Sequence, residues 1–457
     1  MTMLRDIEAA MAGGRGSDEP NAPLTVVGDP SHTRRADVTE LAMSAMIAAV
    51  QAMQAFAKRH FDGDFSATVY HDLVDDWCDS SAAPVGWELP NKWDDLSADY
   101  PTKDGWVRTH ANYPHHNAIV RKVLGNAKNH AEAAAFVAQH TSEEIQEAIV
   151  AGGAAATAWK PRDVWRQSEQ GMAVDEQSIV EWSERPAVGS TWKPTDARRP
   201  LKGLKVLDLT RVLAGPASTR FLATFGASVL RIDPATWGEG LNEIEMTAGK
   251  RCSTLDLKSE DGRAALKELA QEADILVSGY RADALENLGL GEEQLHEINP
   301  NLIYVTLNAF GWKGPWRNRR GFDSLVQRAT GLAAPGPDGK PKALPYQVLD
   351  HSTGYLMAAA AVRALLRASR DSVISTARLS LVRQAHLILD HLDQPRTAMT
   401  PATETQKKRP PSREDTPWGP IDRLPLPFEI EGIDAGWTSP ARGVRKDPPE
   451  FRGDEAA

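Results

Sequence analysis

Between residues 201 and 311 the chain alternates between short apolar runs and longer amphipathic segments. Four runs rich in branched side chains predict buried β-strands, at 204–210, 228–233, 273–279 and 301–311. The segment 259–273 (SEDGRAALKELAQEA) has the apolar spacing of a helix that covers one face of a sheet. This alternation predicts an α/β fold with a parallel sheet and helices on its faces.

The residues before position 201 follow a different pattern. Ala, Met and Leu recur at helical spacing from Asp37 to His60, and FSATVY (65–70) alternates like a strand. Farther along, 141–153 (TSEEIQEAIVAGG) has Thr141 and Glu144 at the spacing of a capping box and ends at two glycines. Helices and strands that are mixed in this way predict a smaller α+β domain.

A weak internal similarity links the two parts of the chain. Residues 37–70 predict a helix rich in Ala and Met followed by a strand, and residues 350–381 repeat this order over a similar length. Ala-rich helices also resemble one another by chance, so the similarity alone leaves both a duplication and a coincidence open.

Composition shifts along the chain suggest four parts. We expect a mobile N-terminal arm over 1–36, a unit over 37–190, the α/β domain over 200–390 and a tail over 391–457. The tail holds 11 of the 30 prolines in 67 residues, so we expect it to lack regular structure and to wrap the surface.

Charge and cysteine content narrow the function classes. The net charge is −10, which argues against a protein that coats nucleic acid or an anionic membrane. No apolar run reaches the roughly 18 residues of a membrane span, and the N-terminus has no signal-peptide core. Cys78 and Cys252 form no C-x-x-C motif and are expected to be reduced and buried, which fits a cytoplasmic protein.

Nucleotide-binding and metal-binding motifs are missing. The first strand runs into AGPAS (214–218) rather than a dinucleotide-binding G-x-G-x-x-G, and the sequence has no Walker motif. His110, His115 and His116 lack the spacing of a catalytic zinc site, so we interpret them as surface or packing residues and expect no metal.

Two other features have both a structural and a functional interpretation. Lys313, Arg317, Arg319 and Arg320 follow the fourth strand, where they form either a solvated loop or a site for phosphate groups. Small residues at 214–217 either admit a ligand or let a helix pack closely.

Asp350 ends an apolar stretch and begins a long Ala-rich helix. A carboxylate at this place is either a helix N-cap or a nucleophile. Because a helix N-terminus stabilises an anion, we expect its pKa at or below the ordinary value of about 3.9.

Together these segments resemble the class III CoA-transferases, the CaiB/BaiF family. The matching blocks are LKGLKVLDLTRVLAGPASTRFLATFGASVLRID, GKRCSTLDLKSEDGRAALKELAQEADILVSGYRADALENLGL, NPNLIYVTLNAFGWKGP, GFDSLVQRATGL and VLDHSTGYLMAAAA. The resemblance implies a Rossmann-like domain over 200–390. The part over 37–190 resembles the later part of a family member, so we interpret it as a truncated first copy that carries the family's small domain.

The resemblance also implies a mechanism. In the family, an aspartate that falls on Asp350 attacks an acyl-CoA thioester, and an aspartyl anhydride and an aspartyl thioester then pass CoA to an acceptor acid. CoA contacts carry over to Val212, Leu255, Lys258, Tyr280, Leu288 and Arg320, and the substrate pocket to Leu213, Phe322 and Asp323. CoA is then a substrate rather than a permanently bound cofactor, and the family implies a homodimer.

Two alternatives stay open. The first is an isomerase similar to α-methylacyl-CoA racemase, although Phe322 stands where that enzyme offers a histidine. The second is a non-catalytic CoA-binding protein, because the glycine-rich loop that often precedes the family's small domain is missing. Leu213 and Gly279 replace polar residues of formyl-CoA transferase, which favours an acyl group larger or more apolar than formate or oxalate.

Overall fold

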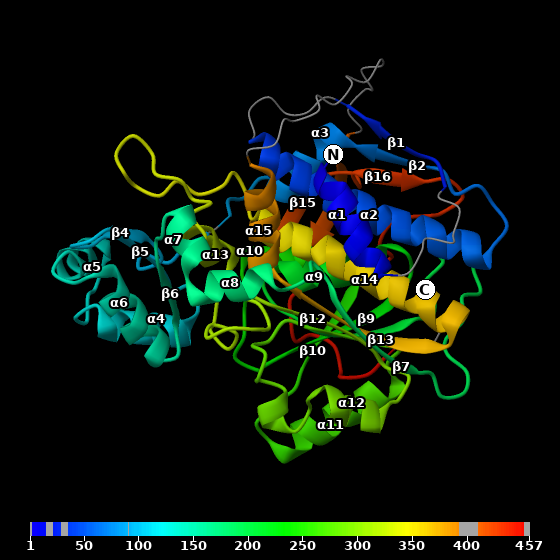
Figure 1. Cartoon of the computed structure of the whole chain (residues 1–457). Helices are drawn as coiled ribbons and strands as arrows, with labels where there is room; N and C mark the ends of the chain where they lie inside the picture. Colours follow the sequence, from blue (N-terminus) through cyan, green and yellow to red (C-terminus); the bar gives the residue numbers. More distant parts are fainter. Residues whose placement is uncertain (1, 15–21, 29–34, 90, 393–409, 452–457) are drawn as a thin grey trace.

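The computed structural model describes residues 2–14, 22–28, 35–89, 91–392 and 410–451. Its centre is a seven-stranded sheet with the strand order β10-β9-β8-β11-β12-β13-β7 (Figure 1). All neighbouring strands are parallel except β7, which runs antiparallel to β13 at one edge. The order of the six parallel strands is the Rossmann order, so the predicted fold class is confirmed.

The elements of this domain begin and end as follows. The strands are Glu181–Pro186 (β7), Lys205–Leu209 (β8), Ser228–Asp233 (β9), Lys250–Thr254 (β10), Ile275–Ser278 (β11), Ile303–Asn308 (β12) and Val373–Ser380 (β13). The α-helices are Ala214–Thr224 (α9), Leu241–Met246 (α10), Glu260–Glu272 (α11), Glu292–Ile298 (α12), Asp323–Ala329 (α13), Val348–Asp371 (α14) and Leu381–His391 (α15), and Glu286–Leu288 forms a short 3-10 helix.

Side chains that alternate along the strands build two cores. Val206, Val277 and Val305 pack with α9 and α14, whereas Leu207 and Leu276 pack on the other face with the apolar side of α11 and α12. Both faces of a parallel sheet must be covered in this way, because its strands are apolar on both sides. Figure 1 shows the two helical layers above and below the sheet.

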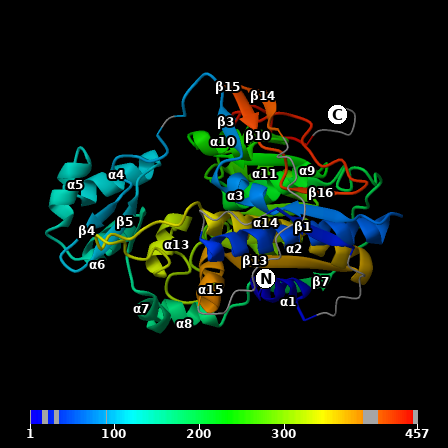
Figure 2. The same ribbon diagram turned by 90° about the horizontal axis from the view of Figure 1, so that it is seen from above.

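Helix α14 is the central helix of the upper layer. Gly354 lets it approach α9, since a Cβ added there would lie 2.4 Å from the Ala214 carbonyl oxygen. The small residues at the start of α9 therefore serve close helix packing, and Ala214 and Gly215 also lie in a cavity wall, so both expected roles stay possible. On its other side α14 packs along α2 (Ala36–His60), and the two helices lie side by side in both views (Figure 2).

Helix α2 is also apolar and long enough to span a membrane by composition. However, the most apolar 18-residue window of the segment Asp37–His60 is 83% buried inside the molecule. Its packing along α14 accounts for this burial, as in the core helix of a folded domain.

A small domain projects from one end of the molecule (Figure 1). It contains the three-stranded antiparallel sheet of Asp99–Pro101 (β4), Trp106–His110 (β5) and Ala155–Ala158 (β6), with helices Pro114–Val123 (α4), His130–Val137 (α5) and Ser142–Ala151 (α6). The predicted capping box of α6 is present, formed by Thr141 and Glu144. Helices Arg162–Gln167 (α7) and Glu169–Asp175 (α8) lead back to the main sheet.

The small domain faces the α/β domain within one chain. The Asp99 carboxylate of β4 accepts hydrogen bonds from Arg108 of the same sheet and from Arg328 of α13. Trp159 donates a hydrogen bond to the Ala333 carbonyl oxygen across the same contact. The small domain and the α/β domain therefore meet within one chain. The interpretation of residues 37–190 as a truncated copy needs this contact.

The two ends of the chain differ from expectation. Residues Thr2–Ala12 form helix α1, whose Met3, Ile7 and Met11 are buried, and Leu24–Val27 forms strand β1. The described part of the expected mobile arm is therefore packed against the core, because its apolar residues recur at helical spacing.

The C-terminal segment also contains regular structure, contrary to expectation. Ser412–Thr416 (β14), Gly419–Arg423 (β15) and Phe428–Ile430 (β16) are strands, and residues 393–409 lie outside the described part. β15 pairs with Ala82–Pro84 (β3), and β16 pairs with Ala67–Tyr70 (β2), which is followed by His71–Asp79 (α3). Strand β15 lies between β14 and β3, and its Pro420 still accepts a hydrogen bond from the Val85 N–H through its carbonyl oxygen.

The expected boundary near residue 190 also differs from the structure. Strand β7 precedes it and completes the main sheet, and α2 packs on α14, so the unit over 37–190 is divided between the two spatial domains. Strand β10 was not among the predicted strands because KRCST carries charged and polar residues. Lys250 is nevertheless buried there, where it forms an ion pair with Asp208.

Candidate active site

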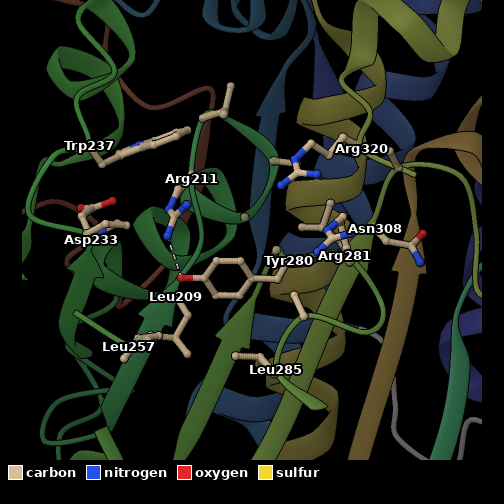
Figure 3. Close-up of a pocket in the computed structure, with 18 of the residues that line it drawn as sticks. Leu209, Arg211, Asp233, Trp237, Leu257, Tyr280, Arg281, Leu285, Asn308 and Arg320 are labelled. Atoms are coloured by element: carbon tan, nitrogen blue, oxygen red, sulfur yellow. Dashed lines mark hydrogen bonds between the residues drawn. The ribbon is translucent and has the colours of Figure 1, made fainter. Parts of the chain in front are cut away.

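A cavity of about 660 Å³ opens at the carboxyl edge of the main sheet. Its walls include residues at the ends of β8, β9, β11 and β12, such as Leu209, Asp233 and Asn308 (Figure 3). In open α/β sheets this edge, beside the point where the strand order reverses, is the usual place for ligands. Here β8 and β11 flank the reversal point, and Arg211 and Tyr280 follow these two strands.

Most of the predicted site residues meet in this cavity. Eight of them line it: Val212, Leu255, Lys258, Tyr280, Leu288, Arg320, Phe322 and Asp350. These residues are far apart in sequence and come together because the strand ends converge.

Two predicted pocket residues lie elsewhere. Leu213 turns away from the cavity lining and packs with Ala217 and Met246 in a small apolar cluster. Asp323 is 1% exposed and lies behind the wall, where it borders a second cavity. Leu213 is therefore not part of the cavity lining, because its buried side chain packs between α9 and α10, and its contact with a substrate stays a prediction.

Asp323 is the residue that caps helix α14. One of its carboxylate oxygens accepts hydrogen bonds from the backbone N–H groups of Leu349 (2.9 Å) and Asp350 (3.2 Å), and the other accepts one from Gln327. Asp350 is the third residue of α14, and its carboxylate accepts no capping hydrogen bond from the described residues. The structure therefore separates the two roles that the sequence left open, since the N-cap function belongs to Asp323.

The electrostatics of Asp350 differ from expectation. Its residue is only 8% exposed, and burial together with the charge of Asp323 raises its pKa well above the ordinary value. Burial also raises the pKa of Asp323 to about 6, although its hydrogen bonds oppose the shift. The helix N-terminus stabilises Asp323 instead, so the expected low pKa of Asp350 is wrong.

The mouth of the cavity is rich in cations. Arg211, Lys258, Arg281, Arg319 and Arg320 line it. Lys313 and Arg317 belong to the same predicted basic cluster but are exposed and lie outside the lining. Half of the cluster therefore lines the cavity, and the other half belongs to a solvated loop.

Arg211 is held between two aromatic rings. Its guanidinium lies 4.6 Å from the ring centre of Trp237 and 4.9 Å from that of Tyr280, and it donates a hydrogen bond to the Tyr280 hydroxyl (Figure 3). Such cation–π contacts fix a cation in a defined position at the cavity wall. Sequence analysis missed Arg211, although its place directly after the first strand is a usable signal.

The loop after β8 is held in a strained conformation. Val212 has a φ of 70°, which is unfavourable for a β-branched residue. Its N–H donates to the Glu239 carboxylate at 2.7 Å, and Glu239 forms an ion pair with the fully buried Arg231. Strain of this kind concentrates at functional sites, where the surrounding structure enforces it.

Aromatic side chains from both domains close the cavity over Asp350. Phe322 stacks on His110 of the small domain with ring centres 3.6 Å apart, and Tyr113 stacks on Trp237 at 4.3 Å. His115 and His116 from α4 line the cavity beside them. The interpretation of the histidines as surface or packing residues holds for the buried His110, but the other two belong to the cavity wall.

Metal and thiol chemistry have no visible basis in the described residues. Within this part of the chain no cluster of three His, Cys, Asp or Glu side chains could hold a metal ion. Cys78 and Cys252 are free and buried, as expected, and burial raises the pKa of the Cys252 thiol to about 12.

Comparison with known proteins gives a consistent result. Residues 201–421 match the family model of CoA-transferase family III. The probable fatty acyl-CoA transferase Rv3272 of Mycobacterium tuberculosis is 32% identical over 236 residues, which cover 46% of this chain and 60% of that protein. The succinate–glutarate CoA-transferase of Agrobacterium fabrum is 35% identical over 193 residues, which cover 38% of this chain and 48% of that protein.

Solved structures give matches of similar extent. A crystal structure of Rv3272 is 34% identical, with 43% of this chain and 61% of that chain covered and a TM-score of 0.39. The chain thus spans about half to three fifths of the length of these relatives.

Proposed function

We propose that this chain, whose residues 201–421 belong to CoA-transferase family III, transfers CoA from an acyl-CoA thioester to a carboxylic acid. The observation that carries the proposal is the position of Asp350. Its carboxyl group lies in the wall of a cavity that is apolar inside and bordered by five cations. This combination suits a ligand with several phosphates at one end and a reactive thioester at the other.

The cations and the apolar residues of the cavity would bind different parts of CoA. Lys258, Arg281 and Arg320 would pair with the phosphates of CoA, because guanidinium and ammonium groups suit phosphate oxygens. Val212, Leu255, Tyr280 and Leu288 would contact the pantetheine chain and the base. CoA would bind and leave as a substrate.

Asp350 would act as the nucleophile. Its carboxylate attacks the thioester carbonyl carbon, and the carbon–sulfur bond breaks with its electron pair on the CoA thiolate. The thiolate then attacks the aspartyl carbonyl, which releases the acyl group as a carboxylate and leaves aspartyl-CoA. The acceptor acid repeats these two steps in reverse, so a difficult exchange becomes a series of acyl transfers.

Relatives whose names state an activity support a CoA-transferase. They include the succinate–glutarate enzyme above, a succinyl-CoA:glutarate CoA-transferase of Mus musculus and an acetyl-CoA:oxalate CoA-transferase of Acetobacter aceti. Several of these names specify dicarboxylic acids. We therefore propose an acyl-CoA and a carboxylic acid as the substrates. Transfer within a cytoplasmic homodimer would follow from the family resemblance.

Mass spectrometry of the intact chain and its peptides tests this function. We expect incubation with a panel of acyl-CoAs to add an acyl group or CoA to the peptide that contains Asp350, and hydroxylamine to remove it. The panel should include short dicarboxylyl, branched and aromatic acyl groups, so that the same experiment ranks the donors. A chain that binds CoA but forms no adduct with any donor would support the non-catalytic alternative.

A further inference from the structure

His116 lies in the wall of the same cavity as Asp350 but comes from the small domain. It is the third residue of helix α4 and is 3% exposed. Its imidazole sits among aromatic rings, with ring centres 4.3 Å from His115, 5.9 Å from Tyr113 and 6.0 Å from Phe322. These packing contacts fix the position of the His116 ring without hydrogen bonds to it.

Both nitrogens of this ring lack a hydrogen-bond partner in the described part of the chain. Buried polar groups are nearly always paired, because an unpaired one costs about 1–3 kcal/mol. Another buried histidine shows the usual arrangement: the two ring nitrogens of His386 contact Trp165 at 2.7 Å and Asp175 at 2.8 Å. An imidazole with two unused nitrogens at a cavity wall indicates that a ligand supplies the missing partner.

The charge state of His116 fits a hydrogen-bond donor. Burial, followed by the influence of His115 and Arg320, lowers its pKa to about 3. The ring is therefore neutral at pH 7 and carries one N–H. A neutral imidazole can polarise a carbonyl group without giving up its proton.

We propose that His116 donates a hydrogen bond to the thioester carbonyl oxygen as that oxygen becomes negative. This inference rests on the proposed function and adds a residue to it. When an oxygen of Asp350 bonds to the carbonyl carbon, the π electrons move to the carbonyl oxygen, which accepts the His116 N–H. Collapse restores the C=O bond and expels the CoA thiolate, and the imidazole proton stays on nitrogen throughout.

Because His116 belongs to the small domain, the proposed hydrogen bond makes the reaction depend on the contact between the two domains. His116 reaches the cavity because β5, on which α4 packs, lies against α13 and Phe322. The acylation step therefore depends on both domains, with the nucleophile from one and the oxyanion donor from the other.

The test compares single-turnover acylation of Asp350 in three variants. His116→Phe removes both nitrogens and keeps a planar ring, His116→Gln restores an N–H, and His140→Phe is the control. His140 is a half-buried histidine of the same domain outside the cavity, and it packs on Phe136. Acylation is followed by quenched mass spectrometry at saturating acyl-CoA, and CoA affinity by isothermal titration calorimetry.

We expect His116→Phe to slow acylation by about 10²–10³-fold, the usual effect of removing one oxyanion donor. The CoA dissociation constant should stay within about twofold. His116→Gln should recover about tenfold or more of the lost rate, and His140→Phe should acylate like the wild type. If His116→Phe loses its melting transition, His116→Leu provides a second variant without ring nitrogens.

Each other outcome overturns the inference. Acylation of His116→Phe at the wild-type rate, or a Gln variant no faster than the Phe variant, shows that the nitrogens do not act in this step. A loss explained entirely by weaker CoA binding shows the same. If the wild-type chain forms no adduct at all, the proposed function fails and this inference fails with it.

Discussion

Helices α14 and α2 are similar in length and composition, yet their N-terminal aspartates have opposite environments. Asp350 of α14 borders a cavity and has a second carboxylate, Asp323, beside it. Asp37 of α2 is equally buried, at 3% exposed, but it forms an ion pair with Arg35. The two helices pack against each other, so the contrast lies within one helical layer.

This contrast shows what separates a reactive carboxylate from a structural one. Arg35 donates two hydrogen bonds to Asp37 and neutralises its charge. Asp350 forms no such ion pair within the described residues, and Lys92 only partly offsets the rise in its pKa. The capping N–H groups of its helix bond to Asp323 instead. A carboxylate whose charge is left without local stabilisation can be stabilised by a ligand, and this is the state in which a nucleophile is useful.

The largest expected effect comes from removing the carboxylate at each place. Asp350→Asn should lower the acylation rate by at least about 10⁴-fold, because no other group replaces the nucleophile. Asp37→Asn should leave the rate within about twofold, because Asp37 lies outside the cavity lining. Quenched mass spectrometry measures both rates. Equal losses in the two variants would show that the aspartates act only through the fold.

A smaller effect is expected when Asp323 loses its charge. Asp323→Asn removes the like charge that helps to raise the pKa of Asp350, so that pKa should fall. The carboxylate is the reactive form. The acid limb of the acylation rate should therefore move to lower pH by about one unit, which gives roughly a tenfold faster reaction at a fixed pH on that limb.

Asparagine can still accept a backbone hydrogen bond through its Oδ1, so helix α14 should keep a cap. The measurement is a pH profile of single-turnover acylation for the wild type and the variant, with CoA affinity recorded at each pH. A profile that stays in place, or moves to higher pH, would show that Asp323 does not control the charge of Asp350.

The smallest effect concerns stability, and its sign should differ between the two helices. Because the folded-state pKa of Asp350 is raised, protonation favours the fold, and this advantage is lost as pH rises from about 4 through the raised pKa. Asp350→Asn should therefore stabilise the chain near pH 8 and change its stability little near pH 4. Asp37→Asn should destabilise it by up to about 1 kcal/mol at pH 7, because the partly exposed Arg35 loses its ionic partner but keeps its hydrogen bond to the Leu332 carbonyl oxygen.

Denaturant unfolding at several pH values measures these differences. An Asp350→Asn variant that is less stable than the wild type at pH 8 would show that the buried charge is already compensated in the folded chain. In that case the charges of Asp350 and Asp37 would both be compensated in the folded chain, and the two helices would not differ in this respect.

Much of the α/β domain could be predicted because its strands have a strong local signal. The run 228–233 coincides with β9, and the amphipathic segment 259–273 contains α11. The cavity residues could be predicted only through the family resemblance, which placed Val212, Tyr280 and Asp350 on strand ends and a helix start. Their roles in binding and catalysis remain predictions.

The parts that were missed depend on contacts between distant residues. The cap supplied by Asp323 and the raised pKa of Asp350 arise from packing of α13 against α14, which leaves no local pattern. His116 and Arg211 reach the cavity through the position of a whole domain and of one loop. Strand β16 has only three residues, and it exists because β2 offers an unpaired edge.

The pairing of β16 with β2 also affects how the chain is made. Tyr70 and Glu429, which share a hydrogen bond in this sheet, are separated by 359 residues. At the usual rates of translation of about 5–20 residues per second, β2 leaves the ribosome roughly 20–70 s before its partner. One side of β2 is therefore an open strand edge until residues 428–430 have been translated, so the sheet β1-β2-β16 is completed long after its first two strands are made.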